Sequence, residues 1–453
     1  MNFDGKKIVV VGTGISGIGA VRLLSHTKAR IVLYDGNASL GEKAVRAKLP
    51  QGADAEIIIG DMPEHTVKSA DLLVISPGVP VDSPIVMQFK AEGVPVWGEI
   101  ELAYSFEKGT VFAITGTNGK TTTTALVGEI MKRHNPKTFV VGNIGIPYTA
   151  KVPETTGDSF TVAEISSFQL ETIHDFKPFG AAILNITPDH LDRHYTMENY
   201  ISVKESITRN QHGEGFCVLN YDDPVLRDFG KNIDNAVYFS SKAKPDYGVY
   251  LDGTMIKYTA DQTDSDIIDV SELLIFGRHN YENVMAATAM TIAAGVPADT
   301  IRKALREFKG VEHRIEFVRE LDGVVYYNDS KGTNPDSSIK AVEAMSRPTL
   351  IIAGGYDKHS EFDDFIDSFN GKVKLMVLIG ETAPLIEKTA KKHGFCNIIR
   401  TDTLENAVKI CHDNAVDGDA VLLSPACASW DMFANFEQRG ELFKEYVNAF
   451  RHN

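Results

Sequence analysis

The sequence has few cysteines and no long apolar run, and both absences narrow the class of protein. Its four cysteines among 453 residues are scattered and form no Cys-x-x-Cys pair, which argues against a disulfide framework and favours free thiols in a reducing compartment. No apolar run approaches membrane-spanning length. Residues 1–7 lead into a predicted strand without the apolar core of a secretory signal. We therefore expect a cytoplasmic protein that does not bind a membrane.

The chain is also short of positive charge, because 46 lysines and arginines face 61 acidic residues, for a formal net charge of −15. This balance argues against general binding to nucleic acid or to an anionic membrane, so an anionic ligand needs a local basic pocket. The apolar share of 43% and the charged share of 24% are those of an ordinary globular protein. For this length we expect about three domains, and a monomer is the default assumption.

The first predicted domain, residues 1–99, begins with a dinucleotide-type βαβ unit. An apolar strand over 8–11 precedes the G-x-G-x-x-G turn of residues 12–17, and a second strand over 31–34 ends at Asp35. The backbone N–H groups of such a turn hold a pyrophosphate, and the acid accepts a hydrogen bond from a ribose or a base. NAD fits this description, and a UDP-sugar fits it equally well.

A second ligand-binding position is predicted at Pro77 and Gly78, which follow the apolar strand over 72–75. Loops at the carboxyl ends of the strands are where open α/β sheets bind their ligands. A plain turn is the alternative interpretation of this Pro-Gly pair.

The second predicted domain, residues 100–309, carries a phosphate-binding loop over 115–122, between an apolar strand and a helical pattern. Such a loop aims backbone N–H groups and a helix N-terminus at phosphate oxygens. Ile114 stands where the full P-loop pattern has a glycine, so a chance Gly-Lys-Thr is the alternative; the flanking strand and helix argue against it. We expect ATP to bind at Gly116, Thr117, Asn118, Gly119, Lys120, Thr121 and Thr122.

Three further polar positions follow in this domain. Glu164 ends a predicted strand, where its carboxylate would join the Thr121 hydroxyl as a Mg²⁺ ligand. His190 lies in a polar turn after a buried strand, and Lys204 lies in a predicted helix. On spacing alone a structural turn or a solvated helix face explains each of them. Asn280 is predicted to cap a helix over 284–294.

The third predicted domain, residues 310–453, has apolar strands over 323–328, 349–353, 375–379 and 420–423 separated by helical patterns. This alternation predicts a second doubly wound sheet. Two lysines and several hydroxyls lie in its loops, which suits a small acidic ligand; ordinary loop polarity is the alternative. The predicted fold class is α/β in three domains: dinucleotide-binding-like, P-loop ATPase-type and doubly wound.

Taken together, these motifs resemble the Mur ligases, in the family's order and across the whole chain. The motifs are Gly116–Thr122, Glu164–Gln169, Asp189–Asp192, His279-Asn280 with Asn283, Glu312–Arg314 and Asp329–Asn334. The Gly12-x-Gly14 unit and the segments 424–429 and 435–440 resemble the branch of the family that adds D-glutamate. An Asp-Asn-Pro-Arg motif would suggest the diaminopimelate-adding branch, and this chain does not contain one. Folylpolyglutamate synthases share the central loop but lack this first domain.

The resemblance implies an ATP-dependent amide ligase with UDP-N-acetylmuramoyl-L-alanine and D-glutamate as substrates, in peptidoglycan precursor synthesis. ATP would convert the alanine carboxylate into an acyl phosphate, and the D-glutamate amine would displace phosphate. Two Mg²⁺ ions would neutralise the charge of the groups that meet there.

The resemblance also implies roles for individual residues. The catalytic group would be Lys120, Glu164, His190 and Lys204, with Thr121, Glu164, His190 and a carbamylated Lys204 holding the metal. Outside the loop, ATP would contact Asn283, Arg314 and Asp329. The UDP-substrate would contact Gly14, Ile15, Ser16, Asp35, Pro77, Gly78 and Asn143. The D-glutamate pocket would be Lys331, Thr333, Lys358, Ser429 and Phe436.

Competing functions stay open on the sequence alone. An NAD-dependent oxidoreductase would explain residues 12–17 and Asp35 but would leave Lys120, Glu164 and His190 without a role. A regulatory P-loop NTPase would explain only Lys120. Within the family, another Mur ligase or a polyglutamate synthase is the main alternative.

Overall fold

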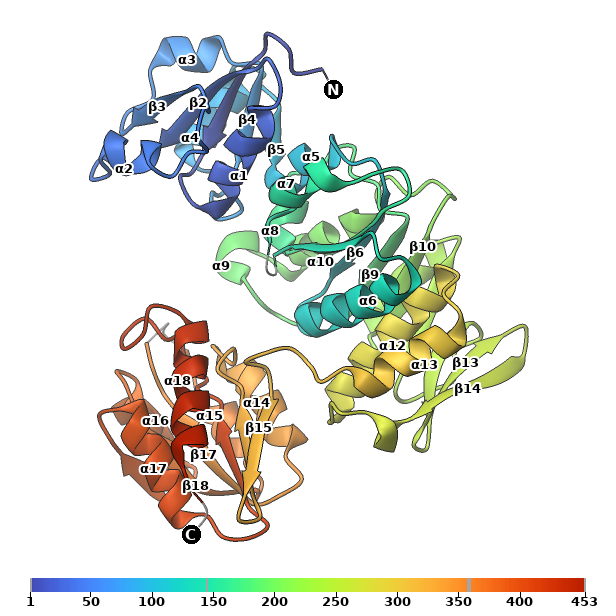
Figure 1. Cartoon of the computed structure of the whole chain (residues 1–453), viewed down its shortest axis with the longest axis vertical. Coiled ribbons are helices and arrows are strands. Elements are labelled where there is room, and N and C mark those ends of the chain that lie inside the picture. The colour runs from blue at the N-terminus through green and yellow to red at the C-terminus, as the bar shows by residue number, and fades with distance from the viewer. Residues whose placement is uncertain (1, 144–145, 357–359, 452–453) are drawn as a thin grey trace. The chain divides into compact units, whose positions relative to one another are not determined.

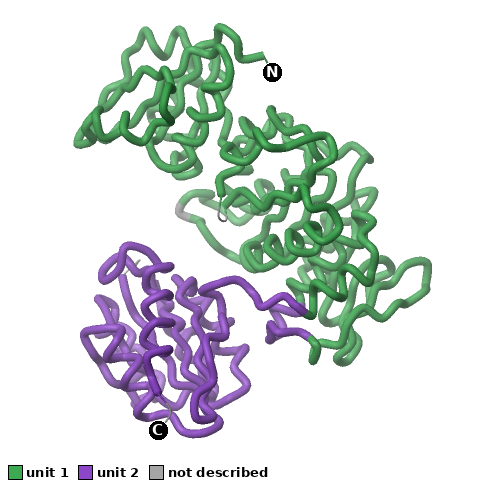
Figure 2. Tube along the Cα trace, viewed as in Figure 1, with its two compact units in different colours: residues 1–272, 282–306 green, residues 273–281, 307–453 purple. Residues whose placement is uncertain are grey.

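The computed structural model describes residues 2–143, 146–356 and 360–451. It is a mixed α/β protein in which strands and helices alternate along most of the chain (Figure 1). The chain divides into two compact units: residues 1–272 with 282–306, and residues 273–281 with 307–453 (Figure 2). Among the described residues, no helix combines the length and the apolar character needed to cross a bilayer.

The N-terminal sheet has five parallel strands in the order β3-β2-β1-β4-β5. Alternate residues of β1 enter different core clusters, with Ile8 and Val10 on one face and Val9 and Val11 on the other. Helices cover both faces, as the continuous apolar strands predict. The elements are β1 (Lys7–Val11), α1 (Ile15–Leu24), β2 (Arg30–Asp35), α2 (Glu42–Arg46), β3 (Ala55–Ile59), α3 (Glu64–Lys68), β4 (Leu72–Ile75), α4 (Pro84–Ala91) and β5 (Val96–Gly98).

The central sheet has nine strands in the order β14-β13-β12-β11-β10-β9-β6-β8-β7. Its parallel part runs from β7 to β12, and β13 and β14 extend it as antiparallel strands. The strands are β6 (Thr110–Thr115), β7 (Thr138–Gly142), β8 (Phe160–Glu164), β9 (Gly180–Ile183), β10 (Phe216–Asn220), β11 (Ala236–Ser240), β12 (Gly248–Asp252), β13 (Met255–Ala260) and β14 (Thr263–Asp269).

The helices of this region include α6, which follows the phosphate loop. The helix α8 connects β8 to β9, and α9 and α10 lie in the connection from β9 to β10. Helix α12 begins at Arg278, so the predicted cap at Asn280 is wrong. Asn280 lies inside the first turn, and its amide donates to the Phe276 carbonyl at 2.8 Å. The helices are α5 (Glu99–Tyr104), α6 (Lys120–His134), α7 (Tyr148–Lys151), α8 (Ser167–Leu170), α9 (Leu191–His194), α10 (Met197–Glu205), α11 (Pro224–Phe229), α12 (Arg278–Ala293) and α13 (Ala298–Glu307).

The C-terminal sheet has the order β15-β16-β20-β17-β18-β19, with β15 antiparallel at one edge. Its core is two-sided: α14, α15 and α16 contribute to one buried cluster and α17 and α18 to the other. The predicted doubly wound sheet is therefore confirmed. The elements are β15 (Glu316–Leu321), β16 (Val324–Asn328), α14 (Pro335–Ala344), β17 (Thr349–Ala353), α15 (Asp363–Asp367), β18 (Val373–Leu378), α16 (Ala383–Lys392), β19 (Ile398–Arg400), α17 (Leu404–Asn414), β20 (Ala420–Leu423) and α18 (Phe436–Ala449).

A buried carboxylate fixes the segment that joins the first two sheets. Glu101, on α5, accepts hydrogen bonds from the backbone N–H groups of His174, Asp175 and Phe176 at 2.7, 2.8 and 3.1 Å. Its side chain is 1% exposed. A carboxylate that accepts several N–H bonds satisfies donors that would otherwise be buried without partners.

We predict that Glu101→Gln lowers the free energy of unfolding by about 1–3 kcal/mol. The substitution replaces one of the two oxygens that accept backbone N–H bonds with an NH₂ group, which is itself a donor. Denaturant titration of the variant measures this loss. Glu42→Gln is the matched control, since Glu42 is an exposed partner of Arg46 on α2, and exposed pairs of this kind contribute little. Equal midpoints for the two variants would contradict the prediction.

Candidate functional site

The phosphate loop has the backbone conformation that its glycines predict. Gly119 has φ +84° and is the residue before α6. A Cβ at this position would lie 2.2 Å from the Asn283 side-chain oxygen, so only glycine fits between the loop and α12. Asn283 also accepts a hydrogen bond from Thr123 at 3.3 Å. The sequence motif and Asn283 therefore lie together.

Side chains beyond the motif hold this loop in place. The Asn118 N–H donates to the Asn185 side-chain oxygen at 2.8 Å, and the Asn185 amide donates back to the Asn118 carbonyl at 3.1 Å. The Thr117 hydroxyl lies 3.0 Å from the Tyr200 hydroxyl and 3.1 Å from the Thr187 carbonyl. Asn185 and Tyr200 were not among the predicted site residues.

Two lysines donate to the same carbonyl oxygen of the loop. The ammonium groups of Lys120 and Lys204 lie 2.9 and 2.8 Å from the Gly116 oxygen. Lys204 is 1% exposed, and its amine lies 4.6 Å from the centre of the Tyr200 ring. Burial, together with the charge of Lys120, holds the pKa of Lys204 well below the ordinary lysine value. A neutral amine is the form that acts as a nucleophile.

Glu164, at the end of β8, presents one carboxylate oxygen without a partner. Its Oε1 accepts from the Asn143 amide at 2.8 Å. Its Oε2 is buried and has no hydrogen-bond partner in the protein, which is costly unless a ligand supplies one. The Thr121 side chain is also buried, on the first turn of α6. A free carboxylate oxygen and a hydroxyl are the hard donors that Mg²⁺ prefers, so these residues fit the ion.

His190 is held next to α8 by an aromatic contact. It has a left-handed backbone, φ 52°, at the start of α9. Its ring centre lies 4.8 Å from that of Phe168. Asp189 lies 3.5 Å from its Nε2 atom. The imidazole is 49% exposed, so it is accessible to a ligand or a metal.

The N-terminal glycine turn is closed by the predicted acid. Asp35 accepts from the Thr13 hydroxyl at 2.7 Å, from the Thr13 N–H at 3.2 Å and from the Asn37 N–H at 3.0 Å. Burial alone would raise the pKa of Asp35, but these hydrogen bonds lower it below the ordinary value. Gly14 caps α1, and Ile15 after it is 78% exposed. Ser16 lies in the first turn of α1.

The turn after β4, which contains Pro77 and Gly78, contacts residues of α9. The Pro77 carbonyl accepts from Arg193 at 3.3 Å, and the Val79 carbonyl accepts from the same guanidinium at 3.1 Å. This turn and the His190 segment are therefore brought together. Sequence reasoning missed Arg193, although it stands beside the Asp189–Asp192 motif.

In the other unit, Asp329 is a wholly buried acid. Its oxygens accept from the Ser424 hydroxyl at 2.7 Å and from the Ile315 N–H at 3.2 Å. Burial raises the pKa of Asp329 to about 7, against an opposing effect of Arg314. The Nε atom of Arg314 is buried without a partner. Arg314 and the fully buried carboxyl thus lie within electrostatic reach of each other.

The predicted amino-acid pocket lies on the loops after β16 and β20. The Lys331 ammonium lies 5.6 Å from the centre of the Phe436 ring, and the Thr333 N–H donates to the Lys331 carbonyl at 2.9 Å. Ser429 is 2% exposed. Lys358 lies outside the described residues. The structure therefore groups Lys331 with Phe436 and leaves the prediction for Lys358 without a described position.

Arg439, on α18, forms hydrogen bonds to both the loop after β16 and the loop after β20. It is fully buried and donates to the Ser330 hydroxyl and carbonyl at 3.0 and 2.8 Å. It also donates to the carbonyls of Cys427 and Ala428 at 3.2 and 3.3 Å. Burial lowers the pKa of Arg439 to about 10. Its role was not predicted, although segment 435–440 carried part of the family resemblance.

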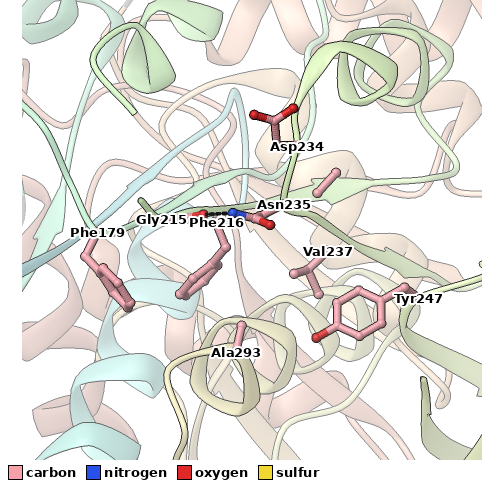
Figure 3. Close-up of a pocket in the computed structure, with 9 residues that line it drawn as sticks. Phe179, Gly215, Phe216, Asp234, Asn235, Val237, Tyr247 and Ala293 are labelled. Carbon is pink, nitrogen blue, oxygen red and sulfur yellow. Dashed lines mark hydrogen bonds between the residues drawn. The ribbon is translucent and has the colours of Figure 1, made fainter. Parts of the chain in front are cut away.

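The pocket in Figure 3 lies apart from the phosphate loop, with a volume of about 560 Å³. Phe216 and Ala236 line it from the starts of the parallel strands β10 and β11. The phosphate loop follows the end of β6, which is parallel to β9 and hence to β10. The pocket therefore lies at the amino ends of the parallel strands, and the phosphate loop lies at their carboxyl ends.

Comparison with known proteins identifies the family. Residues 6–98 match "Mur ligase MurD-like, N-terminal domain", residues 114–291 match "Mur ligase middle domain", and residues 313–427 match "Mur ligase, glutamate ligase domain". The chain belongs to the Mur ligase family. The predicted three-domain α/β fold and the resemblance stated above are thereby confirmed.

Curated Mur ligases match this chain over its whole length. A UDP-N-acetylmuramoylalanine--D-glutamate ligase of Lachnospira eligens is 59% identical, over 99% of this chain and 100% of the relative. The protein of the same name from Clostridioides difficile is 45% identical, over 99% of both chains. Among solved structures, the Thermotoga maritima UDP-N-acetylmuramate-alanine ligase MurC has a TM-score of 0.62 at 20% identity, over 98% of this chain and 99% of that chain; this shows the shared fold.

The buried Asp329 predicts a pH-dependent stability. Below its unfolded pKa of 3.8 the carboxyl is protonated in both states, and above a folded pKa of about 7 it is charged in both. Between these values only the folded protein keeps the proton, so wild-type stability falls as the pH rises, by on the order of 1 kcal/mol per pH unit.

Asp329→Asn lacks this titration. The free energy of unfolding of the wild type relative to Asp329→Asn should therefore decrease from about pH 5 to about pH 8. Denaturant titrations of both proteins across this range measure the difference. A difference that is constant with pH would contradict the assignment of a raised pKa.

Proposed function

We propose that this chain is an ATP-dependent ligase that joins D-glutamate to the alanine carboxylate of UDP-N-acetylmuramoyl-L-alanine, in peptidoglycan precursor synthesis. The full-length identity of 59% to a relative named for this D-glutamate ligation carries the proposal. The phosphate loop, with Lys120 at the start of α6, supplies the chemistry that such a reaction needs.

A carboxylate is a poor electrophile, so the reaction needs a better leaving group. Transfer of the γ-phosphoryl group of ATP to the alanine carboxylate gives an acyl phosphate. The D-glutamate amine attacks its carbonyl carbon, and the tetrahedral intermediate collapses to an amide and inorganic phosphate. Catalysis of phosphoryl transfer is largely a matter of position and charge.

In this proposal the loop residues Gly116 to Thr122 cradle the phosphates of ATP through their backbone N–H groups, and Lys120 places a positive charge on them. To do so, the Lys120 ammonium exchanges its present bonds to the Gly116 and Thr117 carbonyls for phosphate oxygens. Asn283, beside Gly119, contacts the nucleotide from α12. Arg314 and Asp329 are proposed to contact ATP as well.

The UDP-substrate is proposed to bind the N-terminal domain and to extend toward the central one. The glycine turn with Gly14, Ile15 and Ser16 takes the phosphates, because its N–H groups open a helix. Asp35 accepts from the uridine end. The middle of the substrate is proposed to contact Pro77, Gly78 and Asn143. Asn143 donates a hydrogen bond to Glu164, a proposed Mg²⁺ ligand, which would place this part of the substrate near the reacting carboxylate.

D-glutamate is proposed to bind in the C-terminal domain, where two lysines suit its two carboxylates. Lys331 lies over the Phe436 ring, and Arg439 fixes the loops that carry Lys331 and Ser429. Lys358, Thr333, Ser429 and Phe436 complete the proposed pocket.

Two Mg²⁺ ions are proposed to bind here, with Thr121, Glu164, His190 and Lys204 as their ligands. When bound, they would neutralise phosphate charge. The unpartnered Glu164 oxygen supports this assignment. Lys204 is proposed to react with CO₂, because the low pKa of its buried amine favours the neutral form. Attack of the neutral amine on CO₂ forms an N–C bond and releases one proton, and the resulting carbamate would present oxygen ligands that suit Mg²⁺.

The proposed domains are residues 1–99, which bind the UDP-substrate, residues 100–309, which bind ATP, and residues 310–453, which bind the amino acid. We further propose that the protein acts in the cytoplasm as a monomer.

The reaction is tested by phosphate release from Mg·ATP with UDP-N-acetylmuramoyl-L-alanine. We predict release that depends on D-glutamate and is absent with L-glutamate, diaminopimelate, L-lysine or L-alanine. Lys120→Ala should lower the rate by about 10²-fold or more, since it removes a charge that stabilises the transition state. Release with another amino acid would contradict the substrate assignment, and release without any amino acid would favour a regulatory NTPase.

Carbamylation is tested separately with ¹³C-labelled bicarbonate. We predict a carbamate carbon signal in the NMR spectrum of the wild type that is absent from Lys204→Ala. Lys257→Ala is the matched control, because Lys257 forms an ion pair with Asp252 on the antiparallel part of the sheet and should leave the signal unchanged. A signal that persists in Lys204→Ala would assign the carbamate elsewhere.

A further inference from the structure

Arg193, on α9, makes a set of contacts that the proposed reaction does not use. Its side chain is 11% exposed and forms an ion pair with Glu171, itself 9% exposed, at 2.5 Å. Its guanidinium carbon lies 4.6 Å from the centre of the Phe168 ring. The same group donates to the carbonyls of Pro77 and Val79 at 3.3 and 3.1 Å.

These contacts join three segments that lie far apart in the sequence. Pro77 and Val79 belong to the turn after β4 in the N-terminal domain. Phe168 is on α8 and Glu171 is its C-cap, shortly after Glu164 at the end of β8. Arg193 itself is three residues from His190, whose ring contacts Phe168. One side chain therefore links the turn after β4 to the segments of Glu164 and His190.

The chemistry of the contact requires arginine. A guanidinium presents five N–H donors in a rigid plane and lies flat on an aromatic ring, whereas an ammonium is a compact charge on a flexible stem. Here the guanidinium donates to two carbonyls and a carboxylate, and its carbon lies over the Phe168 ring, while its Nε atom is buried without a hydrogen-bond partner in the protein. Because the pair with Glu171 is largely buried, loss of Arg193 is costly: it leaves the Glu171 carboxylate with the His194 ring, whose Nδ1 lies 3.5 Å away.

A second contact between the same regions is exposed. The Tyr195 hydroxyl donates to Asp82 at 2.5 Å, and this bond lowers the pKa of Asp82. Tyr195 is 67% exposed, so water competes for this hydrogen bond. The Arg193 contacts are more sheltered from water, so they are the ones that can hold the turn rigidly.

We propose that Arg193 is a positioning residue: it fixes the turn after β4 against the His190 segment, and so keeps the UDP-substrate site in its binding geometry. This inference rests on the proposed function, which assigns Pro77 and Gly78 to that substrate. Arg193 need not touch the substrate, since it acts through the backbone of the turn.

The test compares Arg193→Met and Arg193→Lys with the wild type. Arg227→Met is the matched control, because Arg227 also donates to a backbone carbonyl, that of Tyr221 at 2.9 Å, and lies 5.3 Å from a ring centre. Arg193→Lys keeps the charge beside Glu171, so it guards against simple unfolding of the methionine variant. Hydrogen exchange of the amides in residues 76–83 is read first, without any ligand.

We expect exchange in residues 76–83 to be about tenfold faster in both Arg193 variants and unchanged in Arg227→Met. The Kd for UDP-N-acetylmuramoyl-L-alanine should rise by about tenfold, which corresponds to ~1.4 kcal/mol, whereas the Kd for ATP should stay within about twofold. This split distinguishes positioning of one site from a general loss of structure.

Unchanged exchange, or an equal loss of affinity for both ligands, would overturn the inference. A wild type that binds the UDP-substrate while both Arg193 variants bind it equally well would overturn the role of Arg193 alone. A wild type that does not bind the UDP-substrate would instead overturn the proposed function.

Discussion

The carbonyl oxygen of Gly116 is the point on which the phosphate site depends. Two ammonium groups, those of Lys120 and Lys204, donate to it. Both cations are thereby held beside the loop that is proposed to receive the triphosphate. Burial is the main cost of a charge on Lys204, and the like charge of Lys120 adds to it. The arrangement therefore favours any change that lowers the charge there: a bound phosphate beside Lys120, or a neutral or carbamylated Lys204.

The same constraint explains the surrounding polar groups. Tyr200 places its ring beside the Lys204 amine and its hydroxyl on Thr117. Glu164 retains one oxygen without a partner, although buried acids elsewhere in this unit, such as Glu101, have theirs satisfied. A folded protein tolerates an unsatisfied buried group chiefly where a ligand completes it. The unsatisfied oxygen and the crowded positive charge are complementary features of one site.

The sequence predicts the parts of this protein that follow from local rules. Continuous apolar strands and the two glycine turns predict the parallel sheets and the phosphate loop, because these depend on a few residues in a row. The antiparallel strands β13 and β14 and the start of α12 at Arg278 were not predicted. Contacts such as Asn118 with Asn185, or Arg193 with Val79, depend on tertiary structure, and polar spacing carries no signal for them. The roles of the individual site residues remain predictions.

Two arginines and three lysines of this chain have different tasks. Arg193 is largely buried and donates to two backbone carbonyls, and Arg439 is fully buried and donates to three, so they fix the shape of the loops. Lys120, Lys204 and Lys331 stand at proposed ligand positions, where a compact charge on a flexible stem can exchange one oxygen for another. A planar guanidinium loses less entropy for each hydrogen bond that it holds. Arg193 and Arg439 are therefore poor candidates for replacement by lysine, and Lys120, Lys204 and Lys331 are poor candidates for replacement by arginine.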